Sequence, residues 1–355
     1  MNRVLILTKY GEWNEQSRNR FYYPLEKFNI KKFQFRIEPL FPSSKNFYTS
    51  YSINTIPRIY QPIKRIIKLV LNSDYEFLWL DTEILEMIPY EWESLLIPLE
   101  KKIILDLGDS KFFKYTKSDS IFTQKFLAKK IYSWIYRADT IITRNQYLEN
   151  FVLKIREDNV YYLPPFTNQL YYREKKIIET LKEKENCIGW VGSPYTTRFL
   201  EILREPLKEL NRVFPIKLKI VGGDTELDLG IKTEFFEWEI ETEWTCISEM
   251  DIGINPIPKN LRETGNLGIR VLKYMAMGIP VVTTPVGGGR DLIEEEVNGF
   301  YASTSDDWYL SLRRLLESTE LREKMSIENR TRFETRYSEE ILIQKLSEIF
   351  GSLLK

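Results

Sequence analysis

Short runs of apolar residues, each followed by a turn and then by a segment of helical periodicity, recur along the chain. Runs of four to eight residues bounded by turn residues and separated by helical segments predict strands of a parallel sheet. In the first half these runs occupy residues 4–8, 33–38, 77–80, 103–105, 140–143 and 160–163. Pro164-Pro165 interrupts the alternation, which restarts at residue 187. The pattern predicts an α/β protein with two doubly wound domains.

The second half repeats the strand–helix pattern and ends in helices. Its predicted strands are residues 187–191, 218–221, 235–238, 251–256, 281–284 and 299–302, and its last helices are 308–316, 321–336 and 338–353. We place the first domain at residues 1–170 and the second at 171–337. The terminal helix, within 338–355, is expected to pack back on the first domain. The charge-rich segment 174–185 is expected to be a linker or a surface helix, and residues 43–57 a loop.

Two helical segments of the first half, residues 58–71 and 122–137, are rich in cations. In the first of them apolar residues recur at helical spacing at positions 63, 66, 67 and 70, against cations at 64, 65 and 68. An amphipathic helix of this kind is expected to cover a sheet with its apolar face. The alternative is contact with an anionic membrane, where lipid-linked molecules reside.

Composition narrows the function classes. The 355 residues are 43% hydrophobic and 14% aromatic, enough for two cores, and Lys+Arg and Asp+Glu balance at 51 each, which argues against nucleic-acid binding by bulk charge. The chain has no histidine, which excludes Ser-His-Asp triads and the usual zinc sites. Cys187 and Cys246 match no metal or disulfide spacing and are expected to be free thiols. No apolar run approaches a signal peptide or a membrane span, so we expect a cytoplasmic protein.

The stretch 262–290 is the strongest candidate for a ligand site. Gly265 and Gly268 bracket a turn before an apolar helix at 269–277, and a β-branched strand and a glycine-rich loop follow. A glycine turn at a helix start exposes backbone N–H groups and the positive end of the helix dipole. Arg270 and Lys273, three residues apart, add two charges to one helix face. We interpret the stretch as a diphosphate cradle; the alternative is an ordinary helix with surface cations.

Two further turns carry candidate chemistry. Gly192-Ser193-Pro194 ends a strand, and Thr196 and Arg198 lie at the start of the helix that follows. Residues 106–110 follow a predicted strand of the first domain, and carboxylates at the carboxyl ends of parallel strands lie where such sheets bind ligands. Asp109 is the candidate there; the alternative is a helix N-cap.

Several of these motifs together resemble the group 1, family 4 retaining glycosyltransferases. The resemblance rests on Gly192-Ser193-Pro194, on 251–256 (DIGINP), on 268–282 (GIRVLKYMAMGIPVV) and on Asn298-Gly299-Phe300. It is strongest over residues 186–336. It implies the GT-B fold, in which two Rossmann-like domains face a central cleft, with a nucleotide sugar on the C-terminal domain and an acceptor on the N-terminal one.

The sequence departs from the usual pattern of that family. The positions of its glutamate pair fall on Asn266 and Lys273, and Lys273 cannot accept a hydrogen bond as a carboxylate does. In this respect the chain is similar to a subgroup that lacks the pair. In that family an arginine and a lysine usually follow the first strand of the second domain. In this sequence the arginine position is occupied by Ser193, and Arg198 lies at about the lysine position. Arg270 could supply the other charge.

The resemblance implies transfer with retention of configuration, without a metal and without an obligatory protein nucleophile. Asp109, Arg198 and Arg270 are then the expected catalytic residues, Asp109 at the sugar or the acceptor hydroxyl and the arginines at the leaving diphosphate. Arg18, Arg20 and Asn145 are expected on the acceptor side, and Trp238 near the base, unless it is a core residue. The nucleotide-sugar site is expected to comprise Gly192, Ser193, Thr196, Trp238, Gly265, Asn266, Leu267, Gly268 and Lys273.

The leading hypothesis is a cytoplasmic hexosyltransferase that uses a UDP- or GDP-sugar and a glycan or lipid-linked acceptor. Nucleic acid is not expected as a partner, and peripheral contact with the inner membrane face remains open. The alternative is a non-catalytic GT-B protein that binds a nucleotide or a partner transferase, which the missing glutamate pair favours. A nucleotide-sugar epimerase of similar fold would need acid–base side chains that the sequence does not reveal.

Overall fold

The computed structural model describes residues 1–28, 32–43, 56–71, 74–116, 118–167, 185–259 and 265–354, with only the backbone for 56–59. The chain forms two compact units. Unit 1 comprises Met1–Phe166 with Leu342–Lys355, and unit 2 comprises Thr167–Ile341. Most of the predicted linker at 174–185 and of the predicted loop at 43–57 lies outside the described residues.

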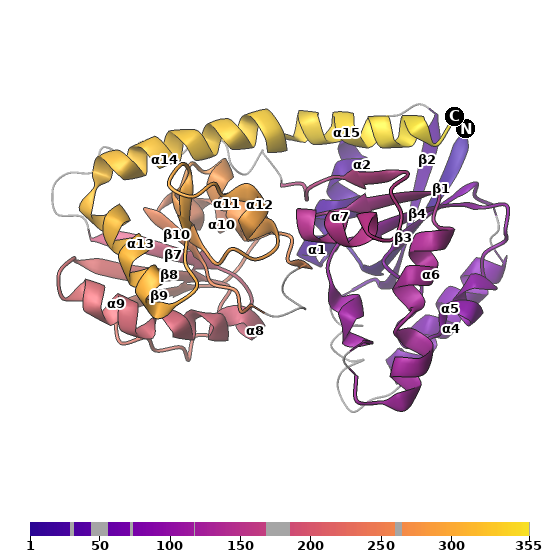
Figure 1. Ribbon diagram of the computed structural model, residues 1–355, viewed down its shortest axis with the longest axis horizontal. Helices are drawn as coiled ribbons and strands as arrows, with labels where there is room; N and C mark the ends of the chain where they lie inside the picture. The colour runs from indigo at the N-terminus through magenta and orange to yellow at the C-terminus, as the bar shows by residue number, and fades with distance from the viewer. Residues whose placement is uncertain are drawn as a thin grey trace. The chain divides into compact units, whose positions relative to one another are not determined.

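Unit 1 is built on a six-stranded parallel sheet in the order β2-β1-β3-β4-β5-β6 (Figure 1). Every predicted strand of the first half is present. The strands are β1 (Asn2–Tyr10), β2 (Phe33–Phe41), β3 (Phe77–Asp81), β4 (Lys102–Leu107), β5 (Thr140–Thr143) and β6 (Val160–Tyr162). The interior strands β3, β4 and β5 are apolar on both faces because helices cover both.

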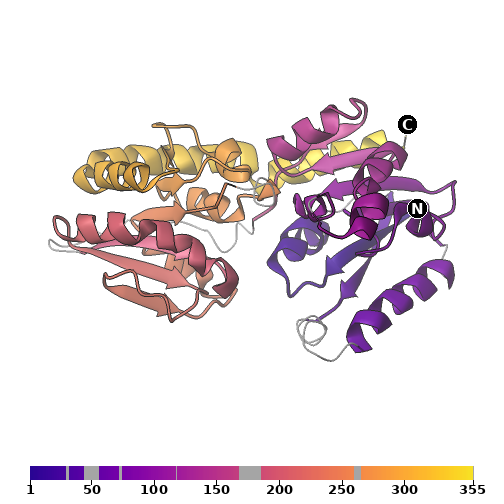
Figure 2. The ribbon, with the colours of Figure 1, turned by 60° about the horizontal axis from the view of Figure 1, so that its bottom comes forward.

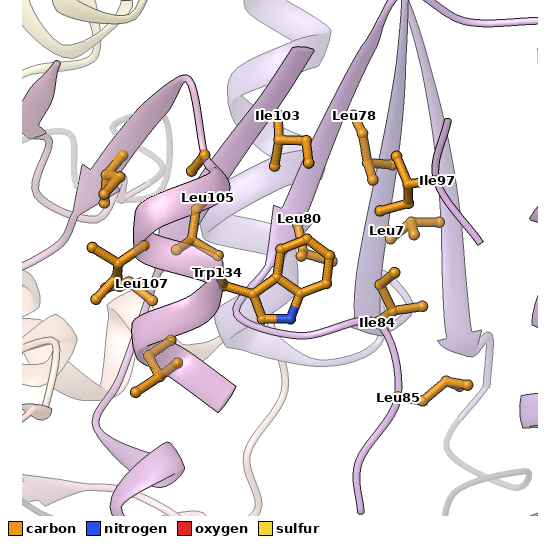
Figure 3. Close-up of a cluster of buried hydrophobic side chains, with 14 of the residues drawn as sticks. Leu7, Leu78, Leu80, Ile84, Leu85, Ile97, Ile103, Leu105, Leu107 and Trp134 are labelled. Carbon is orange, nitrogen blue, oxygen red and sulfur yellow. The ribbon is translucent and has the colours of Figure 1, made fainter. Parts of the chain in front are cut away.

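One face of this sheet is covered by four helices around Trp134. The indole lies among leucine and isoleucine side chains from β3, β4 and the loop after β3 (Figure 3). Its Nε1 donates to the Glu93 carboxylate at 3.0 Å, so the one polar atom of this buried side chain has a partner. The helices are α4 (Ile56–Leu71), α5 (Tyr90–Ser94), α6 (Lys130–Arg137) and α7 (Gln146–Leu153).

The opposite face is covered by α2 (Tyr23–Lys27) and by the C-terminal helix α15 (Glu339–Ser352). Figure 2 shows the strands of unit 1 between α4 on one side and the yellow α15 on the other. Phe350 is fully buried, and its ring lies within 5.6 Å of the rings of Phe28, Phe33, Phe35 and Trp79. Residues from the two ends of the chain thus complete one core.

Unit 2 has a second six-stranded parallel sheet, in the order β12-β11-β10-β7-β8-β9. Its strands are β7 (Asn186–Val191), β8 (Ile216–Val221), β9 (Thr233–Phe236), β10 (Ile252–Asn255), β11 (Val281–Thr283) and β12 (Gly299–Tyr301). Its helices are α8 (Pro194–Thr197), η5 (Arg198–Leu203), α9 (Arg204–Asn211), α10 (Glu243–Ser248), α11 (Ile269–Ala276), α12 (Gly288–Leu292), α13 (Ser305–Glu317), α14 (Thr319–Arg332) and η7 (Phe333–Tyr337). The predicted strands are again all present. Cys187 and Cys246 are free thiols, as expected.

The main difference from the sequence prediction concerns the orientation of α4. The helix forms, but only part of its predicted apolar stripe faces the sheet: Ile66 packs against the core. Ile63, Ile67 and Val70 are exposed, whereas Arg65 is buried and donates to the backbone oxygens of Thr8, Glu38 and Ile84. Three carbonyl acceptors supply hydrogen bonds to a buried guanidinium, which helical periodicity alone cannot anticipate.

A smaller difference concerns helix limits. The predicted helix at 122–137 is divided into a π-helical turn, η3 (Thr123–Leu127), and α6. Near the start of the chain, Asn14 caps α1 (Glu15–Ser17), which is followed by the π-helical η1 (Arg18–Tyr22). In this arrangement Arg20 is buried.

Replacing Phe350 with alanine should destabilise unit 1 by about 3–5 kcal/mol, because a buried aromatic ring is removed from a packed cluster. The measurement is urea unfolding followed by circular dichroism. Leu354→Ala is the matched control, since Leu354 is 40% exposed on the same C-terminal segment. Equal midpoints for the two variants would show that α15 does not contribute to the core of unit 1.

Candidate functional site

The strand order of unit 2 reverses beside β7. The chain moves from β7 outward through β8 and β9, then crosses back to β10, which pairs with the other edge of β7. In open parallel sheets ligands bind at the carboxyl ends of the strands flanking such a reversal. The relevant edge is therefore formed by Val191 at the end of β7, by Gly192 after it, and by Asn255 at the end of β10.

Arg270, on the first turn of α11, crosses this edge. Its Nε donates to the backbone oxygen of Val191, and its Nη1 donates to Asn255 Oδ1 at 2.6 Å. Asn255 Nδ2 in turn donates to Thr283 Oγ1 at 2.9 Å, which fixes the amide so that its oxygen faces the arginine. The guanidinium is half-buried and is held at the switch point of the sheet by two uncharged oxygens.

Gly192 leaves room for this arginine. A Cβ at position 192 would lie 2.3 Å from the Trp190 ring and 2.8 Å from Arg270 Nη2. The guanidinium itself stacks over the Trp190 ring at 4.7 Å, a cation–π contact that adds to its orientation. A glycine after β7 is thus required by the close approach of two side chains.

The turn before α11 is closed on itself by Asn266. Asn266 Oδ1 accepts from Gly268 N at 2.9 Å, and its backbone oxygen accepts from Gly288 N at 2.8 Å. Gly268 has φ of +72°, a left-handed conformation that favours glycine. Gly265 and Leu267 are buried in the same turn. One of the amides assigned to the diphosphate cradle, that of Gly268, therefore already has a partner within the chain.

Lys273 faces away from the glycine turn and forms a buried ion pair. Its Nζ lies 2.5 Å from Glu243 Oε1 on α10, and both side chains are less than a tenth exposed. The same carboxylate oxygen accepts from Trp238 Nε1 at 2.8 Å. Lys273 and Glu243 thus fix the indole of Trp238, which is half-buried beside Gly222 at the end of β8.

The turn after β7 is a helix cap. Ser193 and Thr196 form a capping box, with Ser193 N donating to Thr196 Oγ1 at 3.2 Å. Arg198, at the start of η5, is exposed and lies over the Tyr195 ring at 4.4 Å. The contacts of Arg198 are with neighbouring aromatic rings, whereas Arg270 contacts the sheet edge itself.

Unit 1 has its own strand reversal, between β1 and β3, and charged residues gather there. Arg20 pairs with Asp81 at 2.9 Å and with Asp106 at 2.8 Å, at the ends of β3 and β4. Arg144 pairs with Asp106 from the other side, and Trp79 Nε1 donates to it at 3.2 Å. Asp106 and Arg144 are fully buried, so this part of the predicted ligand edge is a structural ion network.

Burial alone would raise the pKa of Asp106, but the Arg144 and Arg20 guanidinium groups outweigh it and hold the pKa below its ordinary value. The pKa of Arg20 is raised by Asp106 and Asp81 against the opposing effect of burial. Arg20 Nε is buried and lacks a hydrogen-bond partner among the described residues. Asn145, expected on the acceptor side, caps α7 through Leu148 N at 2.8 Å, and Arg18 donates to the Glu12 oxygen.

Asp109 lies beside this network in a pocket with a mixed charge lining. Its Oδ1 accepts from Lys111 N at 2.9 Å, as an N-cap would at the short helix η2 (Lys111–Lys114), and its Oδ2 pairs with Lys111 Nζ at 2.6 Å. Burial would raise the pKa of Asp109, but the Lys111 ammonium lowers it below its usual value. The side chains of Lys9, Arg20, Asp81, Glu86, Asp109 and Lys111 are among those lining the pocket.

The structure brings together Gly192, Arg270 and the 265–268 turn, and separately fixes Trp238 through Lys273. It adds Asn255, Thr283 and Glu243, which the sequence did not single out as site residues. Asn255 had a signal, because a polar residue at the end of an apolar strand is typical of a ligand edge. Glu243 had none, since it follows no periodic pattern. Among the described residues no group of three or more Cys, Asp or Glu could hold a metal ion.

Comparison with known proteins agrees with this geometry. Residues 185–318 match the family model described as glycosyl transferases group 1, and they include β7, the Arg270 site and the glycine-rich loop. No curated protein matches the chain.

Solved structures match over the whole chain. A glycosyltransferase from Rickettsia africae is 15% identical, with a TM-score of 0.71 and coverage of 100% of this chain and 99% of that one. HepE of Anabaena in complex with UDP is 14% identical, with a TM-score of 0.70 and coverage of 99% and 100%. Sucrose-phosphate synthase from Thermosynechococcus elongatus is 13% identical, with a TM-score of 0.70 and coverage of 100% and 99%. The chain has the fold of these proteins, which is GT-B.

Asp106 should give unit 1 a stability that depends on acid pH. Because its folded pKa is depressed, its contribution is fully present above the unfolded value of about 3.9 and is lost as the pH falls through the folded pKa. Asp106→Asn should cost about 3–5 kcal/mol near neutral pH, since Arg144 and Arg20 each lose a buried charge partner. Unfolding midpoints of wild type and variant should converge as the pH falls below the unfolded value of about 3.9, and the exposed control Asp119→Asn should follow the wild type throughout.

Lys273→Met should destabilise unit 2 by about 3 kcal/mol, because the buried Glu243 carboxylate loses the ammonium that it contacts. The double variant Lys273→Met/Glu243→Gln should recover part of this loss. Lys208→Met removes a surface pair with Glu205 and should cost less than about 1 kcal/mol. Chemical denaturation reports all three, and a double variant no more stable than the single one would contradict the pairing.

Proposed function

We propose that the protein is a glycosyltransferase that takes a sugar from a nucleoside diphosphate donor, a UDP- or GDP-hexose, and passes it to a glycan or lipid-linked acceptor. The observation that carries the proposal is the placement of Arg270 across the carboxyl edge of the unit 2 sheet at its strand reversal. The family match over residues 185–318 supports the same assignment. Support for UDP comes from HepE, which was solved with UDP and with UDP-glucose.

Breaking the anomeric C–O bond leaves negative charge on the diphosphate. A guanidinium already oriented before the reaction stabilises that charge without reorganising, and such preorganised groups lower barriers most. In the proposed site Arg270 receives the leaving diphosphate beside the glycine backbone of 192 and 265–268. Arg198, on its exposed turn, adds positive charge from a second helix start.

Trp238 is proposed to contact the base. Its indole is fixed at the end of β8 by the Glu243–Lys273 pair, so an aromatic surface is held in place before any nucleotide binds. In this role Lys273 acts through Glu243 as a positioning residue, which differs from the expectation that it grips the nucleotide directly.

The acceptor is proposed to bind at the pocket of unit 1 that contains Asp109. Ammonium donors and carboxylate acceptors alternate around it, for example Lys9 with Glu86 at 2.6 Å and Lys111 with Asp109. Such a lining suits a polyhydroxylated ligand, because each hydroxyl both donates and accepts. Asp109 is proposed to orient the acceptor hydroxyl. Transfer is proposed to retain the anomeric configuration and to require no metal.

A non-catalytic nucleotide-binding protein is the second candidate. It is favoured by Lys273, a cation paired with Glu243, at the position where the family that the sequence resembles is expected to carry a glutamate. The two candidates differ in turnover. Incubation with UDP-glucose, UDP-N-acetylglucosamine and GDP-mannose, with nucleotide release measured alongside calorimetric binding, separates them. Release above the background rate supports the transferase, and tight binding without release from any donor supports the second candidate.

Arg270→Ala should lower kcat/KM for the accepted donor by about a hundredfold or more, which is the usual effect of losing one transition-state donor. Arg270→Lys keeps the charge but loses the two hydrogen bonds that fix the guanidinium. Its kcat/KM should therefore lie between that of the wild type and that of Arg270→Ala. The matched control Arg212→Ala removes an exposed arginine after α9 and should leave kcat/KM unchanged. Thermal melts verify the fold of each variant. Full activity of Arg270→Ala would remove the residue from the mechanism.

A further inference from the structure

The outward side of α4 carries an apolar stripe. Exposed residues recur at helical spacing: Tyr60, Ile63 at 48%, Ile67 at 51% and Val70 at 64% exposure. The inward side is held by Leu69 and by Arg65, whose guanidinium is bound to three backbone oxygens. The helix cannot rotate its stripe inward without breaking these buried hydrogen bonds.

A second segment of unit 1 repeats the arrangement. Ile121, Phe122 and Phe126 around η3 are exposed, and so is Tyr136 on α6, whereas Ile131, Trp134 and Ile135 of α6 face the core. Both α4 and α6 pack on the same face of the unit 1 sheet (Figure 1). The outer apolar side chains of the two segments, which we call the outer helix face, therefore belong to one helix layer.

The charge on these two segments has a single sign. Residues 56–71 and 121–137 contain no aspartate or glutamate. Lys64, Lys125 and Lys129 are exposed between the apolar residues, and Lys125 lies over the Phe126 ring at 5.3 Å. Lys68 is paired with Glu38 of β2 and contributes less.

The outer surfaces of unit 2 helices are different. On α9, α13 and α14, arginines pair with glutamates three or four residues away, for example Arg204 with Glu201 and Arg313 with Glu317. Such self-neutralised pairs are typical of a solvated helix surface. The described outer helices thus show two surface types: on α9, α13 and α14 cations pair with neighbouring glutamates, whereas residues 56–71 and 121–137 contain no acid.

We propose that the outer helix face of unit 1 docks on an anionic lipid bilayer. Apolar and aromatic side chains enter the headgroup region while lysines meet the negative surface, the combination that holds amphipathic helices at membranes. A second copy of the chain is a poorer occupant, because a two-fold contact would place two acid-free, lysine-bearing faces against each other. The attachment is peripheral: no helix of the described residues is long and apolar enough to cross a membrane.

The test is cosedimentation of the full chain with vesicles of phosphatidylcholine alone or with about one third phosphatidylglycerol, at low and high salt. The wild type should bind the anionic vesicles at low salt, bind neutral vesicles weakly, and dissociate as salt rises. Equal binding to both vesicle types, or none to either, would overturn the proposal.

Two variants locate the binding. Ile63→Ser/Ile67→Ser should reduce anionic binding several-fold, and Lys125→Gln/Lys129→Gln should reduce it by up to about 25-fold, at about fivefold per lysine removed. The matched controls on unit 2, Leu310→Ser/Ile327→Ser and Lys324→Gln, change residues of equal kind and exposure and should bind as the wild type does. Equal loss in the controls would overturn the assignment to this face.

Light scattering in the absence of lipid tests whether a second copy of the chain binds the outer helix face. The wild type should be free of self-association that depends on the outer helix face. A dimer that Ile63→Ser/Ile67→Ser abolishes would assign the face to a second copy and overturn the lipid proposal. Circular dichroism confirms that each variant is folded. These measurements use no nucleotide, so their outcome is independent of the proposed transferase activity.

Discussion

In each unit an arginine is held across the carboxyl edge of a parallel sheet, where the strand order reverses. In unit 2 this is Arg270, fixed by the Val191 oxygen and by Asn255. In unit 1 it is Arg20, fixed by Asp81 and Asp106. The difference between the partners matters. The two oxygens that fix Arg270 are uncharged and orient its guanidinium, whereas the two carboxylates that fix Arg20 also compensate its charge.

This contrast distinguishes an ion network that stabilises the fold from a charged group at a candidate ligand site. The network of Arg20, Asp106 and Arg144 is buried and closed on itself, and breaking one member would leave another uncompensated. The groups of unit 1 that we propose to face a ligand are therefore residues outside the network, such as Asp109 and Lys111. In unit 2 the buried ion pair is formed by Lys273 and Glu243, which fix Trp238, and Arg270 lies at the edge of the sheet. A buried ion pair thus provides a rigid support in each unit, and in unit 2 a separate arginine is oriented at the edge.

The fold was largely predictable from the sequence, and the site was predictable in part. Parallel strands buried on both faces read as short apolar runs, so every strand was found. Gly192, Gly268 and Arg270 could be singled out because glycine turns beside cations have a mechanism that sequence displays. The partners of buried ion pairs cannot be recognised in this way. Nothing in the local sequence marks Glu243 as the partner of Lys273, thirty residues away, or Asp106 as the partner of Arg144. Whether a cation is a ligand group or half of a buried pair depends on tertiary contacts.

The orientation of α4 illustrates the same limit with a larger consequence. Hydrophobic periodicity assigns the isoleucine stripe to the interior, on the premise that apolar burial outweighs every other contribution. Here three backbone oxygens, in β1, in β2 and in the loop after β3, accept hydrogen bonds from one arginine. Those hydrogen bonds hold Arg65 inward, and the helix then presents Ile63, Ile67 and Val70 outward. The acceptors of one buried guanidinium thus determine which surface the protein offers to its surroundings.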